Sequence, residues 1–203
     1  MSMFYRLAYW TGLTPWEEMA TLPISKQITS LLEREERERQ PPYGPALDLG
    51  CGSGIWTIRL AIRGWQVTGI EIVPKALRVA HRRIRKAGVA ARLIQGDMTS
   101  LRTAGVGSDF RLVLDLGAIH GLNNGQRNAV GREVSAVTSP GATMVLLAWM
   151  PANRGPLPRG MSRDDVQEVF PGWELIAEDP ADVSGAPGFV RRAKPCFYRL
   201  RRE

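Results

Sequence analysis

The chain contains few of the residues that build disulfide frameworks and metal centres. Its 203 residues include two cysteines, Cys51 and Cys196, and two histidines, His81 and His120. Two cysteines do not form a disulfide framework in a chain of this size, and these four residues are too scattered to have metal-ligand spacing. We therefore expect no metal cofactor and a cytoplasmic location.

The sequence also lacks a long apolar run. No stretch approaches the roughly 20 apolar residues that a membrane helix needs. The first ten residues place Arg6 among aromatic side chains, which differs from the basic and then apolar layout of a secretory signal. At this length and with 44% hydrophobic residues, we expect one soluble α/β domain with no membrane partner.

The 20 acidic residues are outnumbered by 27 lysines and arginines, which leaves a formal net charge of +7. A basic chain is a candidate partner of nucleic acid or of an acidic substrate. The basic residues of a helix expected at residues 74–88 point largely outward, and a charged helix face is usually solvated; they are Arg78, Arg82, Arg83, Arg85 and Lys86. Nucleic acid therefore stays open as a partner but is not favoured.

Residues 45–54, which read P-A-L-D-L-G-C-G-S-G, are the stretch around which the chain is organised. A short apolar strand there runs into glycines at 50, 52 and 54 and then into a helix. Glycine removes the Cβ atoms that would block a ligand, and the free N–H groups of the new helix favour a negative group. Position 55 is Ile, so the dinucleotide fingerprint is only partly met, and a purely structural turn is the alternative.

Strands and helices are expected to alternate along the rest of the chain. Helices are predicted at 24–39, from the glycine turn to 63, and at 74–88, 126–137 and 162–170; strands are predicted at 66–72, 91–95, 110–116, 142–149, 173–177 and 196–200. This alternation predicts a mostly parallel sheet that binds ligands at the carboxyl ends of its strands. Four acidic residues lie at or near such ends: Asp48, Glu71, Asp97 and Asp115.

Residues 1–40 are interpreted as an N-terminal helical lid or cap and residues 41–203 as the main domain. The segment is rich in aromatic residues, including Tyr9, Trp10 and Trp16. Thr14-Pro15-Trp16-Glu17 has a capping residue, a proline and an acid in the order that starts a helix. The aromatic side chains are expected to close over a ligand or to pack on the flank of the domain.

Over about residues 45–149, this order of glycine-rich and acidic strand ends resembles the class I S-adenosylmethionine-dependent methyltransferases. The resemblance implies a Rossmann-like, mostly parallel seven-stranded sheet with an antiparallel last strand and helices on both faces. It also implies S-adenosylmethionine as cofactor, with S-adenosylhomocysteine as product and no metal. The implied cofactor-binding residues are Asp48, Gly50, Cys51, Gly52 and Gly54 at the methionine end, Glu71 and Ile72 at the ribose, Asp97 and Met98 at the adenine, and Asp115 and Leu116 near the methionine amino group.

The reaction implied by this resemblance is methyl transfer from the sulfonium to a nucleophile, where correct placement of the acceptor supplies most of the acceleration. His120 follows the strand predicted at 110–116. It lies beside the expected position of the methyl group and is the candidate general base. A histidine that shapes the pocket or caps a helix is the alternative.

The acceptor is expected to be a small aromatic or lipophilic molecule methylated at O, N or S. The strand predicted at 110–116 leads into the sequence D-L-G-A. It lacks the D/N/S-P-P-Y/F motif of amino-methylating DNA enzymes and many RNA enzymes. The chain loosely resembles thiopurine and heterocyclic-toxin methyltransferases. Candidate substrate residues are Tyr9, Trp10, Trp16, Trp149 and Arg154. An RNA or protein methyltransferase and a non-catalytic cofactor-binding protein are the alternatives.

Overall fold

The computed structural model describes residue 17 and residues 21–154 and 158–203. Tyr9, Trp10, Trp16 and the helix expected to begin at residue 14 lie outside these described residues, so their expected roles stay predictions. Within the described residues, no helix is both long enough and apolar enough to cross a membrane.

A seven-stranded sheet forms the centre of the molecule, with the strand order β3-β2-β1-β4-β5-β7-β6. The strands are β1 (Pro45–Leu49), β2 (Gln66–Glu71), β3 (Arg92–Gln95), β4 (Phe110–Leu116), β5 (Thr138–Ala148), β6 (Trp173–Pro180) and β7 (Cys196–Arg202). Neighbouring strands from β3 to β5 are parallel, whereas β7 is antiparallel to both β5 and β6. The predicted Rossmann-like sheet with an antiparallel last strand is confirmed.

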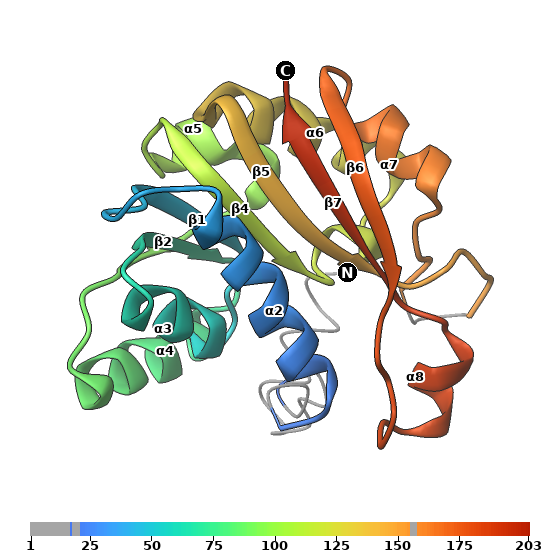
Figure 1. Cartoon of the computed structure of the whole chain (residues 1–203), viewed down its shortest axis with the longest axis horizontal. Coiled ribbons are helices and arrows are strands. Elements are labelled where there is room, and N and C mark those ends of the chain that lie inside the picture. Colours follow the sequence, from blue (N-terminus) through green and yellow to red (C-terminus); the bar gives the residue numbers. More distant parts are fainter. Residues whose placement is uncertain (1–16, 18–20, 155–157) are drawn as a thin grey trace.

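Helices cover both faces of the sheet (Figure 1). They are α2 (Ile24–Arg37), α3 (Ile55–Ile62), α4 (Pro74–Ala87), α5 (Leu101–Ala104), α6 (Asn124–Val137), α7 (Arg163–Val169) and α8 (Gly188–Arg192), with 3-10 turns η2 (Met98–Ser100) and η3 (Ile119–Gly121). Apolar residues of α2 and α3 pack in one core cluster, and those of α6 and α7 pack in the other. The two clusters lie on opposite faces because alternate residues of each strand point to opposite sides.

Local signals place the ends of several helices as predicted. Pro74 occupies the first turn of α4, and Gly88 ends that helix in the left-handed conformation with a φ of 67°. Ser162 and Asp165 form the predicted capping box at the start of α7. A second capping box, between Asn123 and Gln126, starts α6.

The helix α2 belongs to the core of the domain. Its Glu35 side chain is fully buried, accepts hydrogen bonds from Thr143 and Arg199, and forms an ion pair with Arg39 at 2.9 Å. Thr143 lies on β5 and Arg199 on β7, so this network holds α2 against the antiparallel part of the sheet. Residues 24–37 are thus packed into the main domain, although the sequence interpretation assigned them to the lid.

The start of β5 and the connection between β6 and β7 differ from the sequence prediction. Strand β5 begins at Thr138 and not at residue 142, because Pro140 and Gly141 are accommodated by a shift in the pairing of β5 with β4. The connection between β6 and β7 contains the short helix α8, which has five residues and no buried position, so it lacks the apolar periodicity that reveals a helix.

Candidate functional site

The candidate site lies where the strand order reverses at the centre of the sheet. Leu49, the last residue of β1, pairs with Ile70 of β2 on one side and with Asp115 of β4 on the other. The helix that follows β1 covers one face of the sheet, and the helix that follows β4 covers the opposite face. Such a reversal opens a crevice at the carboxyl ends of the strands, where α/β proteins bind their ligands.

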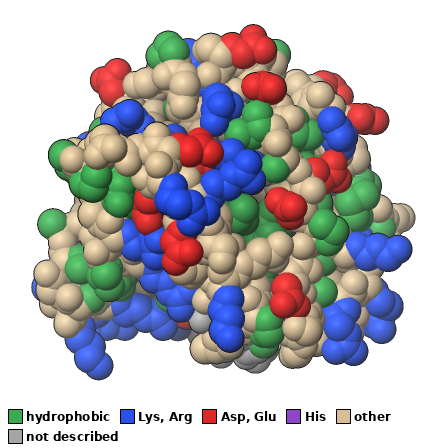
Figure 2. Space-filling view, viewed as in Figure 1, with side chains coloured by type: hydrophobic (Ala, Val, Ile, Leu, Met, Phe, Trp, Pro, Cys, Tyr) green, Lys and Arg blue, Asp and Glu red, His purple; other side chains and the backbone are tan. Residues whose placement is uncertain are grey.

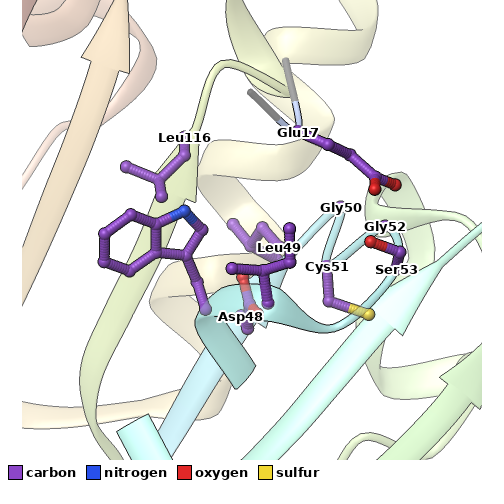
Figure 3. A pocket seen from close by; sticks show the side chains of 10 residues that line it. Glu17, Asp48, Leu49, Gly50, Cys51, Gly52, Ser53 and Leu116 are labelled. Atoms are coloured by element: carbon purple, nitrogen blue, oxygen red, sulfur yellow. The ribbon is translucent and has the colours of Figure 1, made fainter. Parts of the chain in front are cut away.

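A pocket occupies this crevice (Figure 3). It is lined by the stretch from Asp48 to Ser53, by Ile55 and Trp56 of α3, by Leu116 at the end of β4, and by Glu17. The predicted residues Asp48, Gly50, Cys51, Gly52 and Leu116 therefore line one pocket. The mixture of backbone, carboxylate and apolar side chains suits a ligand with both polar and apolar parts.

The glycine turn has a backbone that other residues adopt only with strain. Gly50, Gly52 and Gly54 have φ angles of 62°, 54° and 79°. A Cβ atom at Gly50 would lie 2.7 Å from the Cβ of Ala118, and one at Gly54 would lie 3.0 Å from the Cβ of Ala80. The alternating glycines are therefore required by conformation and by close packing. The N-cap residue Gly54 has no capping side chain, so the first N–H groups of α3, at Ile55 and Trp56, are available to a ligand, whereas the N–H of Thr57 faces Asp48.

Glu71 ties the end of β2 to the glycine turn. One carboxylate oxygen accepts a hydrogen bond from the backbone N–H of Gly52 at 3.0 Å, and the other accepts one from Val73 at 2.8 Å. Burial raises the pKa of Glu71, and the backbone hydrogen bonds from Val73 and Gly52 oppose that rise. Each carboxylate oxygen can accept more than one hydrogen bond, so both keep capacity for a ligand.

Asp48 is a buried carboxyl at the end of β1. It accepts a hydrogen bond from the hydroxyl of Thr57 in α3 at 2.6 Å, which joins the strand to the helix beyond the turn. Desolvation raises the pKa of Asp48 to about 7, the Thr57 hydrogen bond opposes this, and the charge of Glu71 adds to it. Asp48 thus helps to fix the glycine turn by linking the strand before it to the helix after it.

Cys51 contributes to the pocket mainly through its backbone. Its backbone N–H donates to the carbonyl of Ile70 at 3.0 Å. A Cβ atom at Gly69 would lie 2.9 Å from the sulfur of Cys51, so this side chain fills the space that Gly69 leaves on β2. Burial raises the pKa of the Cys51 thiol well above its ordinary value, which leaves it a packing group and not a nucleophile.

The side chain of Asp115 does not line the pocket, in contrast to Leu116 beside it. Its carboxylate is fully buried and accepts hydrogen bonds from the backbone N–H groups of Ala118 at 3.0 Å and Ile119 at 3.2 Å. Burial raises its pKa to about 7. Asp115 therefore shapes the turn after β4, and its expected place near the methionine amino group stays a prediction.

Asp97 and Met98 follow β3 at the same edge of the sheet. One oxygen of Asp97 accepts hydrogen bonds from the backbone N–H and the hydroxyl of Thr99, at 2.9 and 2.8 Å. The methyl end of Met98 would lie 3.6 Å from a Cβ atom at Gly50, so Met98 rests against the glycine turn. The structure thus brings Met98 beside the turn, whereas the side chain of Asp97 hydrogen-bonds to Thr99. Ile72 is partly buried and packs against Val73 and Ala76.

His120 is buried in the turn η3 after β4. Its Nδ1 accepts a hydrogen bond from the backbone N–H of Trp149 at 2.9 Å, so a neutral imidazole carries its proton on Nε2. Desolvation, together with the charges of Arg127 and Arg154, lowers the pKa of His120 to about 3. These surroundings oppose the expected role of general base, because the basic lone pair is already engaged.

Aromatic side chains stand beside His120 at the carboxyl end of β5. The His120 and Trp149 rings meet edge to face with centroids 5.4 Å apart, and Phe189 of α8 meets Trp149 at 6.4 Å. The guanidinium of Arg154 lies 5.7 Å from the Trp149 ring centroid. The predicted substrate residues Trp149 and Arg154 are therefore brought together with His120.

The sequence prediction missed a bridge over the glycine turn. Arg83 of α4 donates a hydrogen bond to the hydroxyl of Ser53 and forms an ion pair with Glu17 at 3.2 Å. The side chain of Glu17 extends over the turn toward Ser53 (Figure 3). Arg83 was expected on a solvated helix face, and the pairing depends on chain segments far apart in sequence.

Comparisons with known proteins match these features. A family model described as Methyltransferase domain matches residues 46–141, which include the glycine turn and the acidic ends of β2, β3 and β4. A protein from Synechocystis sp. named an uncharacterized methyltransferase is 27% identical over 194 aligned residues, covering 89% of this chain and 85% of that protein. Residues 46–141 thus match a methyltransferase domain, and the chain resembles the class I S-adenosylmethionine-dependent methyltransferases.

Methyltransferases of known structure share the fold. The N-methyltransferase NodS from Bradyrhizobium japonicum, in complex with S-adenosyl-L-homocysteine, superposes with a TM-score of 0.73 at 17% identity, covering 91% of this chain and 90% of NodS.

A further relative matches in sequence over a shorter stretch. The Ribosomal RNA small subunit methyltransferase C from Alcanivorax borkumensis is 31% identical over 70 residues. The chain spans only 22% of the length of that relative.

S-adenosylmethionine is the cofactor of the methyltransferases that this chain resembles, and the chemistry of the pocket suits it. An uncapped helix N-terminus suits a carboxylate, a carboxylate oxygen with spare capacity suits a hydroxyl pair, and an apolar side chain against the turn suits a flat base. The cofactor has no pyrophosphate, so the missing glycine of the dinucleotide fingerprint is not required.

Proposed function

We propose that this chain catalyses methyl transfer from S-adenosylmethionine to O, N or S of a small aromatic or lipophilic molecule. The proposal rests on one observation above others: Trp149, Phe189 and His120 form an aromatic wall at the carboxyl ends of β4 and β5, next to the pocket at the glycine turn. Aromatic walls beside a cofactor pocket bind flat molecules by burial and edge-to-face contact.

In this proposal, the chain's residues hold the cofactor from three strand ends. Glu71 binds the ribose hydroxyls with the lone pairs that Gly52 and Val73 leave unused. Asp97 and Met98 bind the adenine, because the Thr99 bonds engage only one oxygen of Asp97. The N-terminus of α3 binds the methionine carboxylate.

The cofactor supplies a methyl group on a positively charged sulfur, whose carbon–sulfur bond breaks as an acceptor lone pair forms the new bond. The protein holds the acceptor in line and excludes water, which accounts for most of the acceleration in such a transfer. His120 holds its proton at Nε2 and donates a hydrogen bond toward the acceptor. The acceptor's proton, where it has one, leaves to solvent or is lost before binding.

Cofactor binding and a methyl-transfer screen test the proposal. At about 100 times its dissociation constant, S-adenosylhomocysteine should stabilise the fold by roughly 2.7 kcal/mol. A screen over phenols, heterocyclic hydroxyls, thiols, aromatic carboxylic acids and RNA should then consume S-adenosylmethionine with at least one small acceptor. The absence of any thermal shift with the cofactor or its product would contradict the proposal.

The aromatic wall can be tested separately through Phe189, which is 40% exposed. Replacing Phe189 with Ala removes the edge-to-face contact that it would make with the ring of the acceptor, which is worth about 0.5–1.5 kcal/mol. We expect KM for an aromatic acceptor to rise about three- to tenfold, with cofactor affinity unchanged. Ile62 on α3 is exposed to 67%, so Ile62→Ala is a matched control for the loss of an exposed apolar side chain.

An RNA methyltransferase is the second candidate, and the basic face of α4 favours it. Arg78, Arg82 and Arg85 are exposed there. Figure 2 shows basic side chains along the lower left edge of this view, over α4, and basic and acidic side chains interspersed elsewhere. RNA binding through this face should fall steeply with salt concentration, because released counterions scale with phosphate contacts. Salt-independent methylation of small acceptors with no RNA binding would exclude it.

A further inference from the structure

Three arginines surround the acceptor side of the proposed site. Arg127 lies on α6, and Arg154 and Arg159 lie on the two arms of the loop after β5, which are joined by a backbone hydrogen bond from Ala152 to Arg159 at 3.1 Å. Arg127 and Arg154 both act electrostatically on His120, and Arg159 acts on Arg127. None of the three forms an ion pair with an acid in the described part of the chain.

Arg127 carries a buried charge that interacts favourably with the charge of Asp165 but forms no ion pair in the described part of the chain. Its side chain is only 5% exposed, and one terminal nitrogen donates to the carbonyls of His120 and Gly160, both at 2.6 Å. Its Nε is buried and has no hydrogen-bond partner among the described residues. A buried cation without a direct ion pair is unfavourable, and an anion bound nearby would reduce that cost.

Arg154 is held in place before any ligand binds. It donates to the carbonyls of Met150 at 2.8 Å and Pro158 at 3.5 Å while its guanidinium lies over Trp149. A guanidinium has five N–H donors, so these bonds leave donors for a further acceptor. Its planar fork matches a carboxylate, and Arg159 on the opposite arm is exposed.

Resting on the proposed function, we propose that the methyl acceptor is an aromatic carboxylate, whose carboxylate anchors the molecule while an O, N or S atom elsewhere on it forms the new bond to the methyl carbon. Arg154 and Arg159 hold its carboxylate, while Trp149 and Phe189 hold its ring. The buried charge of Arg127 adds a positive potential that favours an anion over a neutral molecule of the same shape. The neutral His120, whose available ring group is an N–H donor, adds a hydrogen bond that also favours an anion.

Binding of two matched probes to the complex with S-adenosylhomocysteine tests this inference. Isothermal titration should give 1-naphthoate at least a tenfold lower Kd than 1-naphthylmethanol, since a charge-assisted hydrogen bond is lost in the neutral probe. Arg154→Gln should weaken 1-naphthoate binding about tenfold and leave 1-naphthylmethanol unchanged, whereas Arg154→Lys should keep part of the preference. Arg78→Gln, at an exposed arginine on α4, is the matched control and should change neither probe.

The outcomes separate this inference from the proposed function. Equal Kd values for the two probes, or a preference for 1-naphthoate that survives in an Arg154→Gln, Arg159→Gln double variant, would overturn it while cofactor binding stands. Tighter binding of 1-naphthyl phosphate than of 1-naphthoate would overturn the assignment to a carboxylate. If S-adenosylhomocysteine itself does not bind, the proposed function fails, and the same titrations on the protein alone still decide whether the loop selects an anion.

Discussion

Asp48 and Asp115 should make the stability of this protein depend on pH in a predictable way. Both carboxyls are buried at the ends of neighbouring strands, and burial raises the pKa of each to about 7. The informative substitution is Asp48→Asn, because the amide oxygen can still accept the hydrogen bond that Thr57 donates at 2.6 Å. The variant therefore removes the titrating group and keeps the link between β1 and α3.

The sign follows from proton linkage. A carboxyl whose pKa is higher in the folded state than in the unfolded chain stabilises the fold when it is protonated at low pH. That stability is lost as the pH rises through the folded-state pKa. For a pKa of about 7 in the fold and 3.8 in the unfolded chain, Asp48 should lower the free energy of unfolding by about 2 kcal/mol between pH 5 and pH 7.

His120 acts in the opposite direction, since its pKa is lowered to about 3 and its contribution to stability is lost as the pH falls below its ordinary value of 6.5. The difference in the free energy of unfolding between wild type and variant therefore isolates Asp48 better than the pH dependence of the wild type alone does. Urea unfolding without cofactor at pH 5, 6, 7 and 8 measures it. Relative to wild type, Asp48→Asn should gain about 2 kcal/mol from pH 5 to pH 7.

Asp109 supplies the matched control. It is exposed with a φ of 63°, a conformation that asparagine tolerates, so Asp109→Asn should leave the pH dependence of unfolding unchanged. The reasoning is refuted if Asp48→Asn and wild type lose or gain stability in parallel from pH 5 to pH 8. That result would mean that the carboxyl of Asp48 is ionised in the fold at no cost.

Three further substitutions test the turn and the core. Gly50→Ala should destabilise the fold by about 1–3 kcal/mol in urea unfolding, because its φ is 62° and its new Cβ would lie 2.7 Å from the Cβ of Ala118; an unchanged midpoint would contradict the strained turn. Glu71→Gln should raise the Kd for S-adenosylhomocysteine in calorimetry about tenfold or more, since one amide oxygen replaces two charged acceptors; wild-type affinity would remove Glu71 from the ribose site. Glu35→Ala should cost about 3–5 kcal/mol in the same unfolding assay, as it leaves the buried Arg199 without this partner, and a loss below about 1 kcal/mol would show that the network is dispensable.

Local sequence signals predicted the architecture because they act over short distances. Apolar periodicity marked the strands and most helices, and the capping box at Ser162 and the proline at 74 marked helix starts within one turn. The glycine turn and Glu71 were predicted as parts of one site because parallel strands end at the same edge of a sheet. Each of these features depends on residues close in sequence or on the topology of the sheet.

The roles of individual side chains depended on contacts between distant segments. The sequence placed Asp115 at a strand end, but the tertiary structure turned its carboxylate toward the N–H groups of Ala118 and Ile119. It also made Nδ1 of His120 the acceptor of a hydrogen bond from the backbone N–H of Trp149, 29 positions further along the chain. Neither arrangement has a periodic signature in the sequence.

By itself, the sequence determined the class of fold, the position of the glycine turn and the family resemblance, because periodicity, caps and glycine conformation are properties of short stretches. Only the tertiary structure decided that α2 belongs to the core, that α8 brings Phe189 to Trp149, and that the Nε of Arg127 is buried without a hydrogen-bond partner in the described residues. These depend on which surfaces meet when the sheet is covered. Burial then sets the pKa of each group and the bonds left for a ligand.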